Sequence, residues 1–389
     1  MVNAWHSVIA LVGVWATSQA LFGSPTAAEI LTTDFYDQTC PSLFQIVETV
    51  VISSIQNDTR MAASLLRLHF HDCFVQGCDG SILLDAAGPT KPSEKDALPN
   101  RSLRGFDVID TIKKAVESSC PNIVSCADII TLAAFFSVVQ SKGPSWIVSL
   151  GRRDAFSANT NLTTNIAPPS FNVTQLQDNF AAQNLTTRDL VALLGAHTIG
   201  FSHCSSIHSR LYNFSGINGT ADPTISRTLL TALEATCPSR VNFTVITSLD
   251  IQTPTLFDNL YFQNLLQGNG VLNSDEELVT TADDTNSWVN LYAADQSQFF
   301  NDFAAAIIKM GNLNVLTGTA GEIRQNCRAR NPVSTISVEE TSVTPIQREL
   351  SMARTMFMKM EARSSSKLWR TSNSNLYSSA MLRMTLYPQ

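Results

Sequence analysis

Apolar residues recur at helical spacing over most of the chain. In residues 40–55, 172–184 and 299–313 they return every three or four positions, and the first of these segments has a proline at its first turn. Strict alternation of apolar and polar residues, which a half-buried strand requires, is scarce. Loops that carry proline and glycine, such as residues 85–100, separate the helical segments. The pattern therefore predicts a mainly α-helical protein with very little β-structure.

The two ends of the chain differ from the rest. Residues 1–28 combine a short apolar run with small residues, and the run is too short to span a bilayer. We therefore expect a secretory signal peptide there and no transmembrane segment in the chain. Residues 332–389 are rich in Ser, Thr, Met and Arg and contain no cysteine, so we expect a disordered or processed extension. The folded domain is predicted to comprise residues 29–331.

The composition indicates a disulfide-bonded, secreted glycoprotein. The chain has 389 residues, and its net charge of −7 argues against nucleic-acid binding. Its eight cysteines predict four disulfides in an oxidising compartment, although the sequence alone leaves their pairing open. Their irregular spacing argues against a zinc site. Glycosylation acceptors of the form Asn-x-Ser/Thr occur at Asn57, Asn100, Asn161, Asn172, Asn184, Asn213, Asn218 and Asn242.

Chemically active side chains are densest in the stretch RLHFHDCFVQGCDGS, residues 67–81. On a helix, Arg67 and His71 lie one turn apart on the same face, with Phe70 beside them. This face would present a permanent cation and a titratable base next to an aromatic wall, whereas His69 points elsewhere and is given a structural role. A single pair of this kind is more often a surface or core pair than part of an active site. The neighbouring motifs must therefore show whether this pair belongs to an active site.

Oxygen-bearing groups follow His71 in a turn-rich loop. The loop offers two carboxylates, one hydroxyl and two backbone carbonyls, from Asp72, Asp79, Ser81, Val75 and Gly77. Such hard oxygen ligands suit Ca²⁺ better than a softer metal, although the spacing is not that of an EF-hand. Cys73 and Cys78 could staple the loop. A disulfide-bridged surface loop would explain the same composition.

A second group of motifs lies in the later half of the chain. His197 extends the apolar stripe of a predicted helix that Thr186 or Thr187 could cap, and a histidine there is more often a core residue than a ligand. Further oxygen ligands stand in a proline-bearing loop and in an acidic turn, at Asp250, Thr253, Asp258 and Asp275. For the acidic turn, a solvated surface is the simpler interpretation.

Together these motifs resemble the secretory plant (class III) haem peroxidases. The resemblance covers residues 32–331 and includes LLRLHFHDCFVQGCDGSILLD, VSCADII, GPSWIVSLGRRDA, LVALLGAHTIGFSHC, TPTLFDNLYF and VLNSDEEL in the family's order. It implies a two-part helical fold whose distal and proximal halves enclose a buried haem b. It also implies an enzyme that reduces H₂O₂ to water and oxidises phenolic-type donors in one-electron steps. Such enzymes serve peroxide catabolism, the response to oxidative stress and the polymerisation of cell-wall phenolics such as lignin.

The resemblance assigns roles to the residues of both halves. Arg67, His71 and Asn100 would form the distal catalytic group, with Phe70 in the haem pocket. His71 would move a proton between the two peroxide oxygens, while Arg67 would stabilise the negative charge that develops. Asn100 would be buried, and its glycosylation acceptor would remain unused. On the proximal side the resemblance implies that His197 is the axial iron ligand and that Asp275 is its hydrogen-bond partner.

The resemblance further implies two Ca²⁺ sites and four disulfides. The distal ligands would be Asp72, Val75, Gly77, Asp79 and Ser81, with Glu94 joining through water. The proximal ligands would be Thr198, Asp250, Thr253, Leu256 through its carbonyl, and Asp258. The implied disulfides are Cys40–Cys120, Cys73–Cys78, Cys126–Cys327 and Cys204–Cys237, with a buried ion pair between Asp128 and Arg152. Each Ca²⁺ would brace a segment that carries one haem-facing histidine.

The chain also departs from the family pattern at the donor site. Ala167 stands where the family usually has a proline that lines the phenol site. We expect a monomer that acts on H₂O₂ and small phenolic donors in the extracellular space or cell wall, with the vacuole as an alternative. Two other classes compete with this interpretation: an electron-transfer haem protein, and a secreted calcium-bound haem glycoprotein that acts as a binding module. The pair Arg67 and His71 argues against the first, because electron carriers usually occupy both axial positions.

Overall fold

The structure is a computed structural model that describes residues 30–88, 92–240, 244–280 and 284–332. The predicted signal peptide and the extension after Pro332 lie outside these residues. In the part that is described, no helix combines the length and the apolar character needed to cross a bilayer.

Helices account for most of the described structure, which confirms the predicted fold class. They are α1 (Leu43–Asn57), α2 (Met61–Val75), α3 (Phe106–Ser119), α4 (Cys126–Gln140), α5 (Val173–Ala182), α6 (Thr187–Leu194), α7 (Cys204–Tyr212), α8 (Arg227–Thr236), α9 (Leu260–Leu265), α10 (Asn273–Thr280), α11 (Asp284–Ala294) and α12 (Gln296–Met310). Among these residues the one sheet is an antiparallel pair, formed by β1 (Phe201–His203) and β2 (Ile246–Ser248).

The predicted helix boundaries shift by a few residues in the structure. The helix expected from residue 40 begins at Leu43, so Pro41 precedes the helix instead of lying in its first turn. The helix expected over residues 299–313 begins at Gln296, because the side chain of Asp295 accepts a hydrogen bond from the backbone N–H of Gln298 and caps it.

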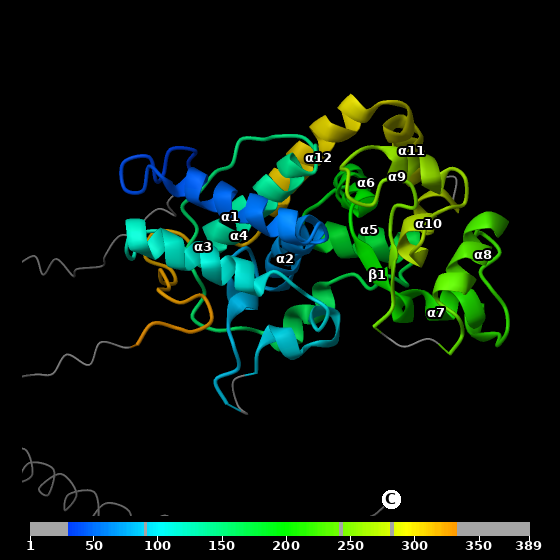
Figure 1. The fold of residues 1–389 in the computed structure, drawn as a ribbon, viewed down its shortest axis with the longest axis horizontal. Helices are drawn as coiled ribbons and strands as arrows, with labels where there is room; N and C mark the ends of the chain where they lie inside the picture. The colour runs from blue at the N-terminus through cyan, green and yellow to red at the C-terminus, as the bar shows by residue number, and fades with distance from the viewer. Residues whose placement is uncertain (1–29, 89–91, 241–243, 281–283, 333–389) are drawn as a thin grey trace, which may run out of the picture. The chain divides into compact units, whose positions relative to one another are not determined.

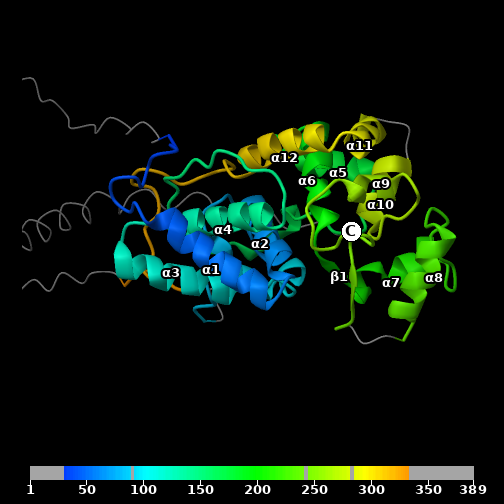
Figure 2. The ribbon, with the colours of Figure 1, turned by 45° about the horizontal axis from the view of Figure 1, so that its top comes forward.

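Two large apolar cores and a smaller one group the helices. One large core packs α1, α3 and α4 together, which lie side by side in Figures 1 and 2, the other packs α5, α6 and α9 to α12, and the smaller one packs α7 against α8. Helix α2 contributes to both large cores, with Leu65 and Leu68 in the first core and Leu66 and Phe74 in the second. Because its apolar residues face both cores, α2 holds its polar face in a fixed orientation between them.

The segment that carries His197 is fixed by a cap and by close packing. The side chain of Thr186, not Thr187, caps α6 in a capping box with Asp189. Helix α6 ends at Leu194, and Gly195 begins the short 3₁₀ helix η5 (Gly195–Thr198). A Cβ atom at Gly195 would lie 2.5 Å from the ring of Phe299. Only glycine therefore lets the aromatic core approach the turn before His197.

Four disulfides cross-link the described chain in the predicted pairs, Cys40–Cys120, Cys73–Cys78, Cys126–Cys327 and Cys204–Cys237. The predicted ion pair is also present, since Arg152 Nη1 donates to Asp128 Oδ1 over 2.9 Å and both side chains are buried. Of the glycosylation acceptors that the structure describes, Asn100 is buried and the others are exposed. This burial agrees with the expectation that Asn100 stays unmodified.

Candidate active site

The predicted distal residues come together at the polar face of α2. His71 and Arg67 lie one helical turn apart, and Arg67 Nε donates to His71 Nε2 over 3.1 Å. Asn100 ends the short 3₁₀ helix η3 (Leu98–Asn100), and its Oδ1 atom lies 2.6 Å from His71 Nδ1. The ring of Phe70 meets the ring of His71 edge to face, with centroids 5.2 Å apart.

The hydrogen bonds of Asn100 define the tautomer of His71. The Nδ2 group of Asn100 donates to the backbone carbonyl of Glu94 over 2.8 Å, so its Oδ1 atom must face His71. An amide oxygen can only accept, and His71 therefore carries its proton on Nδ1 and donates it to Asn100. The other nitrogen, Nε2, carries a lone pair, which accepts from Arg67. His71 is thus held as a neutral base with a defined direction.

Burial and charge keep this histidine neutral. Burial lowers the pKa of His71 well below its usual value, the charge of Arg67 lowers it further, and the bond to Asn100 opposes the shift. Arg67 is exposed, yet protein encloses it closely enough to lower its pKa to about 10, which leaves it charged at neutral pH. Its Nη1 and Nη2 groups donate to Ser102 Oγ and to the carbonyl of Pro99. Sequence analysis did not assign these two anchors, because neither belongs to the helical motif.

The predicted proximal pair also forms. His197 Nδ1 lies 2.8 Å from Asp275 Oδ1, and Asp275 is buried in the first turn of α10. Tyr261 on α9 donates its hydroxyl to the same carboxylate oxygen over 3.0 Å. Tyr261 was missed from sequence, although it lies in the quoted motif TPTLFDNLYF. With Nδ1 engaged, Nε2 is the ring nitrogen of His197 that a metal could take.

Each of the two histidines has partly buried apolar side chains beside it. The side chain of His197 is 34% exposed although it follows a buried helix. Partly buried apolar residues stand beside each histidine, Phe70 on α2 and Leu193 and Ala196 before His197. Ala167, the predicted donor-site residue, is half-buried against the same core. The chain therefore offers one imidazole as a ligand and apolar surface around it.

The distal oxygen ligands surround buried polar atoms that lack partners. Ser81 Oγ and Glu94 Oε2 are buried without a hydrogen bond among the described residues. Burial raises the pKa of Asp72 well above its usual value, and the charges of Asp79 and Glu94 raise it further. The predicted carbonyls already accept hydrogen bonds, that of Val75 from Asn165 Nδ2 and that of Gly77 from the N–H of Asp79. A cation would satisfy the orphan oxygens and balance the clustered carboxylates.

The proximal oxygen ligands show the same signature. Asp250 Oδ2 and Thr253 Oγ1 are buried and unpaired, while Thr198 Oγ1 donates to Asp258 Oδ1 over 3.3 Å. Leu256 is 40% exposed, and its backbone N–H donates to the carbonyl of Thr253. In the described chain no three His, Cys, Asp or Glu side chains form a metal site by themselves. A cation at either position would depend on hydroxyl and carbonyl oxygens as well.

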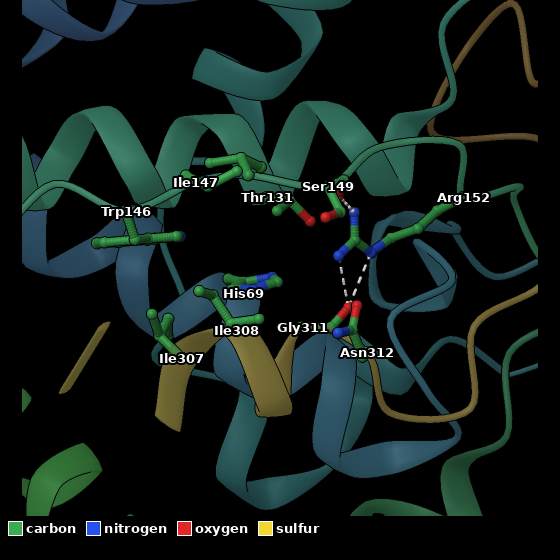
Figure 3. Close-up of a pocket in the computed structure, with 11 residues that line it drawn as sticks. His69, Thr131, Trp146, Ile147, Ser149, Arg152, Ile307, Ile308, Gly311 and Asn312 are labelled. Carbon is green, nitrogen blue, oxygen red and sulfur yellow. Dashed lines mark hydrogen bonds between the residues drawn. The ribbon is translucent and has the colours of Figure 1, made fainter. Parts of the chain in front are cut away.

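A surface cleft lies elsewhere, between α4 and α12. His69, Trp146 and Arg152 are among the residues that line it, as Figure 3 shows, and Arg152 donates to the carbonyl of Gly311 there. Burial and the charge of Arg152 lower the pKa of His69 to about 3, so this histidine is neutral. The cleft contains neither His71 nor His197, which supports the structural role expected for His69.

Comparison with known proteins places the chain in a family. A family model described as "Peroxidase" matches residues 47–295. The chain is 50% identical over 314 residues to Peroxidase 15 of Ipomoea batatas, covering 80% of this chain and 95% of the relative. It is 52% identical over 303 residues to Peroxidase 22 of Arabidopsis thaliana, covering 77% of this chain and 86% of the relative. Peroxidase 49 of the same plant is 50% identical over 299 residues, which cover 76% of this chain and 90% of the relative.

A helical fold with these two histidine environments, together with relatives of this similarity, defines a haem peroxidase. The chain belongs to the secretory plant (class III) peroxidases. It is a secreted enzyme that reduces H₂O₂ with electrons from donor molecules and uses haem to do so. The electron-carrier and binding-module alternatives are not favoured.

Proposed function

We propose that this peroxidase cleaves H₂O₂ between a distal group of Arg67, His71 and Asn100 and a proximal pair of His197 and Asp275. The observation that carries the proposal is the contact of Asn100 Oδ1 with His71 Nδ1 over 2.6 Å, from which it follows that the lone pair of His71 is on Nε2. Haem b bound through iron to His197 Nε2 would supply the redox chemistry, and the chain would bind, orient and move protons. The fit rests on the orientation of His197 and the apolar residues beside it.

Proton transfer is the task of the distal group. His71 Nε2 accepts a proton from one peroxide oxygen and returns it to the other, so that water leaves. Its lowered pKa suits this role, because the imidazole is neutral when peroxide arrives. Arg67 stabilises the negative charge on the departing oxygen, since its guanidinium is already fixed by Ser102 and Pro99. Asn100 Oδ1 accepts the hydrogen bond from His71 Nδ1, so this proton stays on the ring throughout the transfer.

The proximal pair tunes the iron ligand. Asp275 accepts the Nδ1 proton of His197 in a hydrogen bond, which makes the opposite nitrogen a stronger electron donor. Tyr261 holds the same carboxylate oxygen and thereby restricts the carboxylate to one orientation. This arrangement favours the high oxidation states that peroxide chemistry requires.

We further propose that Ca²⁺ occupies both oxygen sites. Of the seven buried side-chain oxygens without a hydrogen bond among the described residues, four belong to the two predicted ligand sets, two to each, and these four support the assignment. The distal ligands are Asp72, Val75, Gly77, Asp79 and Ser81, with Glu94 through water. The proximal ligands are Thr198, Asp250, Thr253, the carbonyl of Leu256, and Asp258. Asp72 adjoins His71 and Thr198 adjoins His197, so each ion would fix the register of one histidine.

The donors, in this proposal, are small phenols that bind near Ala167, and the enzyme acts as a monomer in the extracellular space or cell wall. The mature domain would span residues 29–331, after removal of a signal peptide over residues 1–28, with residues 332–389 as an extension. Alanine is smaller than the proline usual in the family, so the site has more room at this position.

A spectroscopic experiment tests the proposal. The full chain, loaded with haem and Ca²⁺, is mixed with H₂O₂ in a stopped-flow instrument, and the haem spectrum and peroxide consumption are followed before and after adding p-cresol. We expect a rapid spectral change with one equivalent of peroxide and a return to the starting spectrum with two equivalents of phenol. A protein with an intact haem spectrum that leaves peroxide unconsumed would instead be the binding module.

A further inference from the structure

Three buried tyrosines each donate to a carboxylate, Tyr36 to Asp128 and, in the core that packs α9 and α11, Tyr261 and Tyr292. Tyr261 donates to Asp275 Oδ1 over 3.0 Å, and Tyr292 on α11 donates to Asp302 Oδ2 over 2.7 Å. A phenol loses an electron more readily when a base can accept its proton in the same step. Tyr261 and Tyr292 are therefore equipped to be oxidised and reduced reversibly inside the protein.

The two tyrosines belong to one continuous row of aromatic rings. The ring of His197 lies 6.3 Å from that of Tyr261, which lies 5.0 Å from Phe262. Phe262 lies 5.2 Å from Tyr292, and Tyr292 lies 6.0 Å from Trp288. Helices α9 and α11 carry these rings and run side by side in Figures 1 and 2. The row thus connects the proximal histidine with Trp288.

Trp288 ends this row near the protein surface. It lies one helical turn before Tyr292 and is half-buried. The guanidinium of Arg188, whose side chain is 48% exposed, stands 5.0 Å from the centre of the indole ring. Arg188 Nε also donates to Asp302 over 2.8 Å, so a carboxylate offsets its charge. Leu291, three residues after Trp288 on α11, is 40% exposed.

The other tryptophan that the structure describes provides a contrast. Trp146 is separated from Tyr292 by two phenylalanines, Phe303 and Phe299, whereas Trp288 contacts Tyr292 directly. Phenylalanine is much harder to oxidise than tyrosine or tryptophan. Of the two tryptophans that the structure describes, Trp288 is therefore the one whose next ring toward His197 is a tyrosine, with the single phenylalanine Phe262 between that tyrosine and Tyr261.

We propose that Trp288 is a second oxidation site, at which phenol groups carried on polymers too large for the haem pocket donate electrons that pass through Tyr292 and Tyr261. The inference rests on the proposed peroxidase function, which supplies the oxidant. The donor class follows from geometry, because a phenol on a polymer can touch a residue at the surface of α11 without entering the interior.

The electron and proton balance closes at each step. Tyr261 gives one electron to the oxidised haem group, and its proton moves to Asp275. An electron from Tyr292 restores Tyr261 as the proton returns, while the proton of Tyr292 moves to Asp302. Trp288 then reduces Tyr292, which recovers its proton from Asp302. The polymer-bound phenol finally gives one electron to Trp288 and releases its proton to water, leaving a phenoxyl radical on the polymer.

Trp288→Phe tests the inference, with Trp146→Phe as the matched control. The full chain loaded with haem and Ca²⁺ is given either p-cresol or dextran carrying 4-hydroxyphenyl groups. Trp288→Phe should lower kcat/KM for the dextran about tenfold and change that for p-cresol by less than about twofold. Trp146→Phe should change neither. Tyr292→Phe should reproduce the selective loss, and it serves as the second variant where Trp288→Phe folds poorly.

A readout independent of turnover accompanies these rates. One equivalent of H₂O₂ is added without donor in the presence of a spin trap, and peptide mapping locates the adduct. We expect an adduct on Trp288 in the wild type and in Trp146→Phe, and a much weaker one in Tyr292→Phe. An unmodified Trp288 would overturn the inference, and so would a turnover of the dextran by Trp288→Phe equal to that of the wild type. In either case, turnover of p-cresol by the wild type would still support the proposed function. A wild type that fails to oxidise p-cresol would overturn both.

Discussion

The distal and proximal histidines are held in the same way by different chemistry. Each uses Nδ1 for a hydrogen bond to an oxygen from a separate segment, but His71 has the amide of Asn100 and His197 has the carboxylate of Asp275. A neutral partner leaves the lone pair of Nε2 weakly basic, which suits a group that must both take and give a proton. An anionic partner enriches the ring in electrons, which suits a ligand of oxidised iron. In the proposed function, the partner at Nδ1 thus separates the residue that moves a proton from the residue that would bind iron.

The largest expected effect comes from removing the distal base. His71→Leu should slow the first spectral change with H₂O₂ by about 10²- to 10⁴-fold, because proton transfer between the peroxide oxygens loses its carrier. Stopped-flow spectroscopy measures this rate. His208→Leu on α7, which removes an imidazole outside both groups, is the control and should leave it unaltered. An unchanged rate in His71→Leu would remove this residue from the mechanism.

A smaller loss is expected when the proximal partner is made neutral. Asp275→Asn should lower the rate of the reaction with peroxide by about ten- to a hundredfold, since His197 loses its anionic acceptor. Resonance Raman spectroscopy of the iron–histidine stretch provides a second measurement, which should move to lower frequency. Tyr261→Phe retains the carboxylate and should have a much weaker effect. Equal effects of the two substitutions would show that orientation, not charge, is what Asp275 supplies.

The reverse exchange on the distal side should alter the pH dependence. In the wild type the pKa of His71 is held well below its usual value, so activity should persist as the pH falls toward that pKa. Asn100→Asp places a negative charge beside Nδ1, which favours the imidazolium and raises the pKa. The acid limb of the pH–rate profile should therefore move to higher pH, and the rate near the midpoint of this limb should fall about tenfold. Asn290→Asp, exposed on α11, adds the same charge elsewhere and should leave the limb in place.

The smallest expected effect distinguishes a bound cation from an empty site. With Ca²⁺ bound, Ser81→Ala removes a ligand and should reduce the free energy of unfolding by about 1 kcal/mol. Without the ion, the same substitution removes an unpaired buried hydroxyl and should be neutral or stabilising. Thermal unfolding should therefore show a destabilising effect in Ca²⁺ that disappears or reverses in chelator, and Thr253→Val provides the matched test at the proximal site. The same sign in both buffers would contradict the distal assignment.

The sequence predicted local features of the site better than long-range ones. The spacing of Arg67 and His71 predicts a common helix face, because one helical turn is a local property. Tyr261, Ser102 and Pro99 were missed as partners, since each meets its target through the packing of a separate segment. The disulfide pairs were expected from the family resemblance alone, because spacing does not determine which cysteines meet. Helix ends moved where a capping side chain, such as Asp295, lay outside the apolar repeat.

The segment Asn100-Arg101-Ser102 is both a glycosylation acceptor and part of the distal group. Asn100 uses Nδ2, the nitrogen to which a glycan would be attached, to bind the carbonyl of Glu94, while Ser102 accepts from Arg67. Folding and glycosylation therefore compete for one nitrogen atom during secretion. A chain modified there before η3 forms could no longer orient its base, so rapid folding of this loop is itself a condition for producing active enzyme.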